Sequence, residues 1–229
     1  MIPQSKAKIF PAEERGLAQS DGFKSRYSFN FRQYQHVHKI PFGNLCVLND
    51  DVLAAEQSLH FVAGADMYLV LIPIIGALNF SDNKGCSSEL VAGYIQTFTI
   101  EKSTSFALSN PYKNEAVNFL QLWIRTDSFQ SHIARPVEVN LDKNINGLLT
   151  VLSYPQFTIS LGKYSGRKEG DYKLKAGTNG IFAFIIDGQM EVQYRLLQSR
   201  DGMGLWEQDT IEWEALSATA ILLLAEVKL

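Results

Sequence analysis

Histidine is the side chain best suited to bind a transition metal or to transfer a proton near neutral pH, and this chain has four histidines. His36 and His38 are separated by one residue, and alternate residues of a strand point to the same side. We interpret this pair as part of a polar loop rather than a metal site, because it lies beside Lys39 and no carboxylate at a suitable spacing completes it. His132 also lies in a polar stretch, whereas His60 stands at the start of a long apolar segment.

Other arrangements of residues that support catalysis are missing from the sequence. There is no Gly-x-Ser-x-Gly turn, no phosphate-binding glycine loop and no cysteine with a histidine partner recognisable by motif. The neighbouring carboxylates Asp50 and Asp51 are explained more simply by an acidic turn. Glu212 and Glu214 alternate with apolar residues, which is typical of the solvated face of a strand.

The composition indicates a soluble folded protein without a nucleic-acid partner. Hydrophobic residues make up 46% of the chain, and the net charge of −3 lacks the basic excess that dominates nucleic-acid affinity. Cys46 and Cys86 form neither a disulfide framework nor the closely spaced pairs of a zinc site. The N-terminus lacks the apolar core of a signal peptide, and the longest apolar run, residues 67–78, is too short to span a bilayer. We therefore predict a cytoplasmic protein with no membrane partner.

Any site in this chain must be positioned by β-strands, because apolar and polar residues alternate repeatedly and helical periodicity is almost absent. The central stretch, Leu59 to Phe80, is typical of a strand, a buried apolar strand and a glycine turn. An internal repeat pairs Leu69–Gly76 with Ile181–Gly188, and each segment is an apolar strand that ends in a turn glycine. The sequence therefore predicts an all-β protein with two similar halves.

Several short motifs follow one another along the chain in an order that matches a known family. They are Arg15-Gly16, Tyr27-Ser28-Phe29 with Tyr34, the segment Phe42–Asp51, the dipeptide Asp66-Met67, and Leu120-Gln121-Leu122-Trp123-Ile124. In these motifs the chain resembles the pirin family of the cupin superfamily. The resemblance implies an all-β bicupin fold: two tandem β-barrels of the double-stranded β-helix or jelly-roll type. We expect the N-terminal cupin barrel at residues 1–130 and the C-terminal cupin barrel at residues 131–229.

The same resemblance implies a metal site whose ligands are replaced in this chain. Pirin-like proteins hold a divalent metal, usually described as iron, with three histidines and one glutamate, a ligand set that suits a redox-active first-row ion. Two histidines form a His-x-His motif before the Asp-Met dipeptide, and the other two ligands come from a His-Ser-Glu motif. The matching positions here hold Val62, Gly64, Leu108 and Asn110. We predict that the protein binds no metal and no cofactor, and that these four residues line a pocket.

Three polar side chains are further candidates for the predicted pocket: His60, Asp66 and Gln96. Strand parity places His60 on the same face as Val62 and Gly64. Two interpretations of His60 stay open, a hydrogen-bond donor to a pocket ligand and a histidine at the pocket rim.

The replaced metal ligands favour a binding function over an enzymatic one. We expect a metal-free, pirin-like bicupin that is non-enzymatic and binds a small molecule or a protein partner in a regulatory role, which has precedent in the family. The alternative is a cupin enzyme, either similar to quercetin dioxygenase or with a metal-independent activity in the first-barrel cavity. Dioxygenase chemistry requires a metal to bind the substrate and to manage oxygen, so the loss of all four ligands removes its physical basis.

Overall fold

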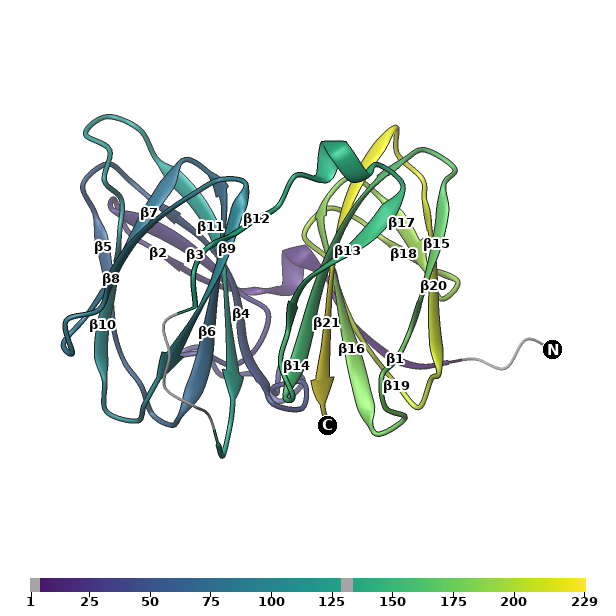
Figure 1. The fold of residues 1–229 in the computed structure, drawn as a ribbon, viewed down its shortest axis with the longest axis horizontal. Helices are drawn as coiled ribbons and strands as arrows, with labels where there is room; N and C mark the ends of the chain where they lie inside the picture. Colours follow the sequence, from purple (N-terminus) through teal and green to yellow (C-terminus); the bar gives the residue numbers. More distant parts are fainter. Residues whose placement is uncertain (1–4, 129–133) are drawn as a thin grey trace. The chain divides into compact units, whose positions relative to one another are not determined.

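The computed structural model describes residues 5–128 and 134–229, and these residues are almost entirely β-strands, turns and loops (Figure 1). The helical segments within these ranges are two short 3-10 helices, η1 (Ala12–Glu14) and η2 (Leu141–Asn144). No helix in the described ranges is long and apolar enough to cross a membrane. The all-β prediction is confirmed, whereas His132 lies outside the described residues.

The chain divides into two compact units, and each unit is built from two antiparallel sheets. The first, here called the N-terminal unit, comprises Gly16–Pro41 and Leu45–Val139. The second, here called the C-terminal unit, comprises Met1–Arg15, Phe42–Asn44 and Asn140–Leu229. Two such paired-sheet units in one chain confirm the predicted bicupin fold.

In the N-terminal unit a seven-stranded sheet, ordered β12-β9-β6-β11-β4-β3-β2, packs against a four-stranded sheet, ordered β5-β10-β7-β8 (Figure 1). Their facing side chains form one core, which includes Leu71 and Phe119 of the larger sheet and Phe80 of the smaller sheet. The strands are β2 (Gly16–Gln19), β3 (Phe23–Tyr27), β4 (Leu45–Leu53), β5 (Ser58–Val62), β6 (Met67–Ile75), β7 (Ala77–Asp82), β8 (Ser87–Val91), β9 (Tyr94–Ile100), β10 (Ser105–Ser109), β11 (Val117–Arg125) and β12 (Val137–Glu138).

In the C-terminal unit a six-stranded sheet, ordered β1-β19-β16-β21-β14-β13, packs against a four-stranded sheet, ordered β15-β20-β17-β18. The core between them is mainly aliphatic, with Tyr164 and Trp213 as its buried aromatic side chains within the described ranges. The strands are β1 (Lys6–Phe10), β13 (Gly147–Ser153), β14 (Phe157–Ser165), β15 (Glu169–Lys173), β16 (Asn179–Asp187), β17 (Met190–Val192), β18 (Arg195–Leu197), β19 (Gly202–Trp206), β20 (Thr210–Ala215) and β21 (Thr219–Lys228).

The predicted internal repeat corresponds to equivalent strands of the two units. Strand β6 lies between β9 and β11, and β16 lies between β19 and β21. Each strand is followed by a glycine in the left-handed region, Gly76 with φ 82° and Gly188 with φ 81°. A side chain at Gly188 would lie 2.3 Å from the carbonyl oxygen of Thr219, so both backbone conformation and space require glycine there.

The first strand, β1, belongs to the C-terminal unit and not to the N-terminal barrel in which we expected it. Strand β1 pairs with β19, and Ala7 lies opposite Leu205, so residues 6–10 belong to the C-terminal unit. The expected division at residues 1–130 therefore does not describe this strand, because its backbone hydrogen bonds are formed with a segment near the other end of the chain. The expected boundary at residue 130 also differs, because β12 (Val137–Glu138) still belongs to the N-terminal unit.

Candidate functional site

The four positions that match the metal motifs do not converge in the structure. On β5 the side chains of Leu59 and Phe61 are buried in the core, whereas Val62 is 66% exposed on the outer face. Leu108 of the neighbouring β10 is fully buried in the core, on the opposite face of the same sheet from Val62. Gly64 is exposed after the end of β5, and no heavy atom lies within 4 Å of the position of a Cβ there. Burial of Leu59 and Phe61 determines which face of β5 points inward.

Asn110, the fourth of these positions, is buried, and its amide is used by the surrounding backbone. Its Nδ2 donates to the carbonyl oxygens of Leu53 (3.1 Å), Ala54 (3.0 Å) and Glu115 (2.7 Å). Its Oδ1 accepts a hydrogen bond from the backbone N–H of Tyr112 at 2.9 Å. Asn110 therefore joins the loop after β10 to the end of β4, which is a structural role.

Aromatic side chains occupy the core beside Phe61. We call Phe31, Phe61, Phe106 and Trp123 the aromatic cluster. The Phe61 ring is stacked on Phe106 with centroids 5.1 Å apart, and Trp123 contacts Phe61 edge-on at 5.4 Å. Phe31 contacts Trp123 edge-on at 5.2 Å. Aromatic rings therefore fill the part of the core in which the inward-pointing side chains of β5 and β10 meet.

The residues at this place do not fit a metal ion. Transition metals in proteins take imidazole, carboxylate or thiolate ligands, whereas the inward side chains of the strand that carries the motif and its extension are Phe61 and Ala63. Within residues 5–128 and 134–229, no group of three or more His, Cys, Asp or Glu side chains could hold a metal ion. The described residues at the motif positions therefore supply no set of metal ligands.

The three polar candidates lie at separate places and serve the backbone or the surface. The Oδ1 of Asp66 accepts a hydrogen bond from the backbone N–H of Lys102 at 2.7 Å. The Oε1 of Gln96 accepts a bond from the hydroxyl of Ser88 at 2.7 Å, and its Nε2 donates to the carbonyl oxygen of Ala134 at 2.9 Å. His60 is exposed on the outer face of β5. Asp66 and Gln96 thus stabilise loops.

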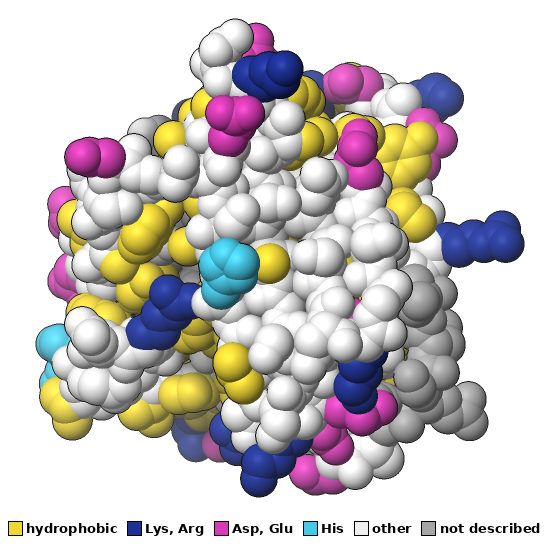
Figure 2. Space-filling view, turned by 90° about the vertical axis from the view of Figure 1, so that its left-hand side faces the viewer, with side chains coloured by type: hydrophobic (Ala, Val, Ile, Leu, Met, Phe, Trp, Pro, Cys, Tyr) yellow, Lys and Arg dark blue, Asp and Glu magenta, His cyan; other side chains and the backbone are white. Residues whose placement is uncertain are grey.

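His60 and Val62 do share an open surface hollow of about 400 Å³, which lies over β5, β10 and β7. The side chains on this outer face include Ser81, Ser105 and Ala107. Figure 2 views the molecule from the side on which these strands lie, and the centre of that face is mostly uncharged. The strand parity that grouped His60 with Val62 is therefore correct, but their shared face is the outer one.

The histidine pair in the preceding loop agrees with its interpretation as a loop feature. His36 and His38 are exposed, and their ring centroids are 5.6 Å apart. The Nδ1 of His36 accepts a hydrogen bond from the backbone N–H of His38 at 3.1 Å. One imidazole nitrogen is thereby used to hold the local turn.

A polar group that sequence analysis did not select as a site lies inside the N-terminal unit. We call Asn49 and Asp51 of β4 and Gln121 of β11 the polar cluster; their exposed fractions are 1%, 0% and 1%. Trp123 Nε1 donates to Gln121 Oε1 at 2.7 Å, and Gln121 Nε2 donates to the Asp51 carboxylate. Parity places these side chains on the core face of their strands, because Leu53 and Phe119 on the same faces belong to the core.

Burial shifts the titration of Asp51. Loss of hydration raises the pKa of its carboxyl group from the ordinary 3.8 to about 6, and the neighbouring charge of Asp50 adds to that rise. Hydrogen bonds from Ser25 and Gln121 and the positive charge of Arg32 act in the opposite direction. Desolvation outweighs these three contributions, so the carboxyl group changes protonation state near pH 6.

A tight turn, Phe31–Tyr34, lies over this part of the core. Phe31 N donates to Tyr34 O at 3.1 Å, Tyr34 N donates to Phe31 O at 2.9 Å, and Arg32 has a left-handed φ of 50°. The Arg32 guanidinium lies over the Phe61 ring at 4.7 Å and donates to the carbonyl oxygen of His60 at 2.7 Å. We call this turn the cover.

The cover rests on a glycine of β2. A Cβ at Gly16 would lie 2.5 Å from the Tyr34 ring, so the absence of a side chain makes room for the tyrosine. Gly16 is opposite Tyr27, Tyr27 is opposite Asn49, and Asn49 is opposite Gln121 on four successive strands. The cover is therefore in register with the polar cluster.

Four of the family-like motifs meet at this place. Gly16, Tyr27, Tyr34, Asn49, Asp51, Gln121 and Trp123 all come from motifs that carry the resemblance to pirins. The signal was thus present in the sequence, but periodicity alone could not show that strands far apart along the chain would bring these residues together.

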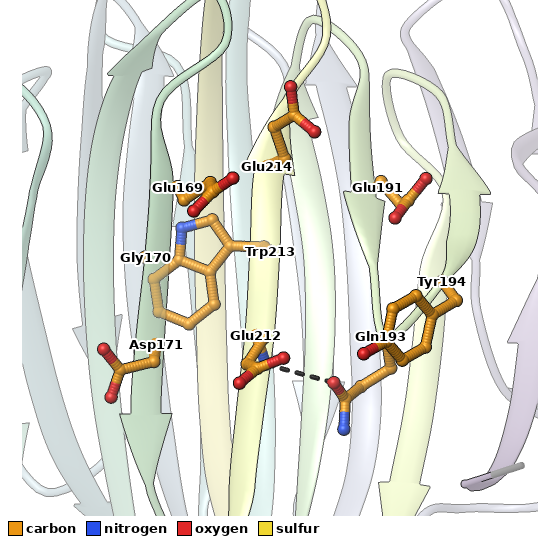
Figure 3. Close-up of a pocket in the computed structure, with 9 residues that line it drawn as sticks. All are labelled: Glu169, Gly170, Asp171, Glu191, Gln193, Tyr194, Glu212, Trp213 and Glu214. Carbon is orange, nitrogen blue, oxygen red and sulfur yellow. Dashed lines mark hydrogen bonds between the residues drawn. The ribbon is translucent and has the colours of Figure 1, made fainter. Parts of the chain in front are cut away.

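The C-terminal unit has an open acidic hollow of about 400 Å³ on the outer face of its four-stranded sheet (Figure 3). Glu214 of β20 lies opposite Glu169 of β15 on one side and Glu191 of β17 on the other. Glu212 lies opposite Asp171. This arrangement agrees with the interpretation of Glu212 and Glu214 as a solvated strand face, since Glu212 is exposed and Glu214 is partly exposed.

Two paired-sheet units, equivalent central strands and equivalent turn glycines in one chain define a bicupin. Residues 154–225 match the family model described as the quercetinase C-terminal cupin domain of pirins. The chain is 23% identical over 221 residues to quercetin 2,3-dioxygenase of Escherichia coli strain K12, covering 93% of this chain and 95% of that relative. It is 24% identical over 225 residues to a pirin-like protein of Caulobacter vibrioides, covering 93% and 96%.

Solved structures show the same fold. The bacterial pirin YhhW of Escherichia coli in complex with nickel(II) aligns with a TM-score of 0.84 at 18% identity, covering 97% of this chain and 99% of that one. A quercetin 2,3-dioxygenase of Acinetobacter baumannii aligns with a TM-score of 0.74 at 12% identity, covering 96% and 85%. Over nearly its whole length, this chain is therefore similar to proteins of the pirin family of the cupin superfamily.

Proposed function

We propose that this pirin-family bicupin works without a metal ion, as a non-enzymatic protein that binds a small molecule or a protein partner. One observation carries the proposal: the positions of the metal motifs hold Val62, Gly64, Leu108 and Asn110, which lie on different faces and offer no ligand set. A metal ion needs several ligands that converge, because one side chain cannot offset the desolvation of the ion.

The packing around these positions supports the same proposal. The inward face of β5 contributes Phe61 to the aromatic cluster, so rings stand where a metal would need imidazoles. Oxygen chemistry on a flavonol requires a metal that binds both substrate and oxygen, and the described side chains give such an ion no place.

Metal analysis and an activity assay test this function together. The purified protein should contain less than about 0.1 equivalent of iron, nickel, copper, zinc or manganese, before and after anaerobic incubation with each ion and desalting, because no ligand set offsets the desolvation of an ion. It should not turn over quercetin under conditions in which the Escherichia coli relative does. One equivalent of a transition metal together with quercetin turnover would contradict the proposal.

The second candidate is a cupin enzyme, and a specific observation favours it. Relatives that cover nearly the whole chain are named quercetin 2,3-dioxygenase, including those of Escherichia coli K12 and O157:H7. The same assay separates two forms of this candidate, because metal-dependent turnover disappears after chelation whereas a metal-independent activity does not.

A further inference from the structure

The side chain of Asn49 has no hydrogen-bonding partner among the described residues. It is 1% exposed, and neither its Oδ1 nor its Nδ2 is bonded. The two amide atoms can be exchanged without changing this result, because both lack a partner. A buried amide without partners costs free energy, so native proteins satisfy nearly all such groups.

A second unsatisfied atom lies on the same strand face. Asp51 is two residues further along β4, and alternate residues of a strand point to the same side about 6–7 Å apart. One carboxylate oxygen, Oδ2, accepts from Gln121, and the Ser25 side chain on the paired strand also interacts with the carboxyl group. Oδ1 has no partner with hydrogen-bond geometry among the described residues. Three unsatisfied polar atoms therefore point into one part of the core.

We propose that Asn49 and Asp51 form an internal binding site for ordered water. A water molecule here accepts a hydrogen bond from the Asn49 amide and donates one to Asp51 Oδ1. Buried waters usually form about three hydrogen bonds, which matches the three unsatisfied atoms. The same molecule, or a second one, donates to Asn49 Oδ1.

The chemistry of the site selects a neutral molecule of this size. The site contains both a donor and acceptors, so it requires a ligand that can accept and donate, which excludes a simple anion or cation. Asn49 and Asp51 are 1% and 0% exposed, so the site is separated from bulk solvent. Tyr27 lies opposite Asn49, and its ring packs edge-on against Phe31 of the cover with centroids 5.1 Å apart. Water thereby extends the chain of hydrogen bonds Trp123–Gln121–Asp51 as far as Asn49.

A crystal structure of the full chain at about 1.5 Å resolution, grown without alcohols or polyols, tests the site directly. The proposal expects a water peak within normal hydrogen-bond distance, about 2.7–3.2 Å, of both the Asn49 amide and the Asp51 carboxyl group. Absence of such a peak beside well-defined side chains would overturn the proposal.

The substitution Asn49→Leu gives an independent test by the sign of its effect. If water connects the two residues, leucine removes its partner and leaves Asp51 Oδ1 unsatisfied, so Tm falls by about 2–4 °C or more. If Asn49 is simply unsatisfied, replacement by an apolar side chain of similar shape leaves Tm unchanged or raises it, and this result would also overturn the proposal.

The matched control is Thr97→Val. The Thr97 hydroxyl is also buried and has no hydrogen-bonding partner among the described residues. Among these residues, no carboxylate lies opposite Thr97 on the neighbouring strand β6. Its replacement should leave Tm unchanged or raise it. Water relaxation dispersion should count at least one fewer long-lived internal water in Asn49→Leu than in the wild type, and the same number in Thr97→Val.

Discussion

The two units each bury one carboxylate within the described residues, and these carboxylates are satisfied very differently. In the C-terminal unit, Glu226 Oε2 accepts a hydrogen bond from Tyr172 Oη at 2.6 Å. Its Oε1 accepts from the backbone N–H of Lys175 at 2.9 Å and from Asn179 Nδ2 at 2.6 Å. Burial, together with the hydrogen bond and charge of Glu226, raises the pKa of the Tyr172 hydroxyl. Glu226 is an anchor for the loop between β15 and β16.

Asp51 of the N-terminal unit has fewer partners in a more aromatic surrounding. Its Oδ2 accepts a hydrogen bond from Gln121, and Ser25 also interacts with the carboxyl group, whereas Oδ1 has no bonded partner among the described residues. Burial raises the pKa of Asp51 to about 6. The repeat therefore preserves the strand frame, with Gly76 and Gly188 in equivalent turns, but it does not preserve the polar contents of the core. Chemistry inferred for one half cannot be transferred to the other by the repeat.

The largest effect should come from removing the anchor in the C-terminal unit. Glu226→Ala leaves the Tyr172 hydroxyl and two N–H donors without their acceptor, so it should lower the free energy of unfolding by about 4 kcal/mol. Urea unfolding followed by tryptophan fluorescence measures the loss. Glu226→Gln is the control, and it should cost less because one acceptor oxygen remains. Equal losses in the two variants would refute the anchoring role.

The pH dependence of stability should report the titration of Asp51. Since the pKa of Asp51 is about 6 in the folded chain and 3.8 is its ordinary value, the folded state binds more protons between these values. The free energy of unfolding should therefore fall as pH rises from about 4 to about 6, by up to about 3 kcal/mol. Urea unfolding at a series of pH values measures this slope.

Asp51→Asn is the matched variant for that series, because an amide of the same shape does not titrate. Its free energy of unfolding should lose the part of the slope between about pH 4 and pH 6 that belongs to Asp51. An unchanged slope would assign the pH dependence to other groups.

A smaller effect should come from moving the cover. Gly16→Ala places a Cβ about 2.5 Å from the Tyr34 ring, so the turn must shift, and we expect a loss of about 1–3 kcal/mol. Gly64→Ala is the control in the same unit, because nothing lies within 4 Å of its Cβ position. Limited proteolysis should cut residues 28–41 faster in Gly16→Ala only. Equal cleavage in both variants would show that Tyr34 does not hold the turn.

Local patterns predicted the parts of the fold that depend on local geometry. Alternation in Leu120–Ile124 identified β11, and an apolar run followed by glycine identified both β6 and β16. The pairing of β1 with β19 could not be read in this way, because strand pairing across the chain depends on tertiary packing that no local pattern encodes.

The candidate site was only partly predictable for a related reason. Motif order located Val62 correctly on a strand but not its direction, which is decided by the burial of its neighbour Phe61. Asn49 and Gln121 were recognised as motif residues, yet their cross-strand contact appears only once β4 and β11 are paired. The sequence predicted that Asn110 lines a pocket, whereas its amide donates hydrogen bonds to three backbone carbonyl groups in the structure.

The smallest effect concerns the outer faces of the two four-stranded sheets. Glu214 lies directly between Glu169 and Glu191. It forms an ion pair at 3.3 Å with Arg167, whose side chain is 79% exposed. Like charges opposite one another on a sheet destabilise it, so Glu214→Lys should raise the free energy of unfolding by about 0.5 kcal/mol at low salt. This gain should disappear in 1 M NaCl, where the Debye length is about 3 Å.

The matched control for that charge reversal is Ser81→Lys on the outer face of the N-terminal unit. Ser81 lies between Ala107 and Ser87, which carry no charge, so a lysine there has no carboxylate directly opposite and should change stability little at either salt concentration. Urea unfolding of both variants in low and high salt measures the difference. A salt-independent gain in Glu214→Lys would mean that β-propensity or packing, rather than relief of repulsion in the acidic hollow, stabilises the variant.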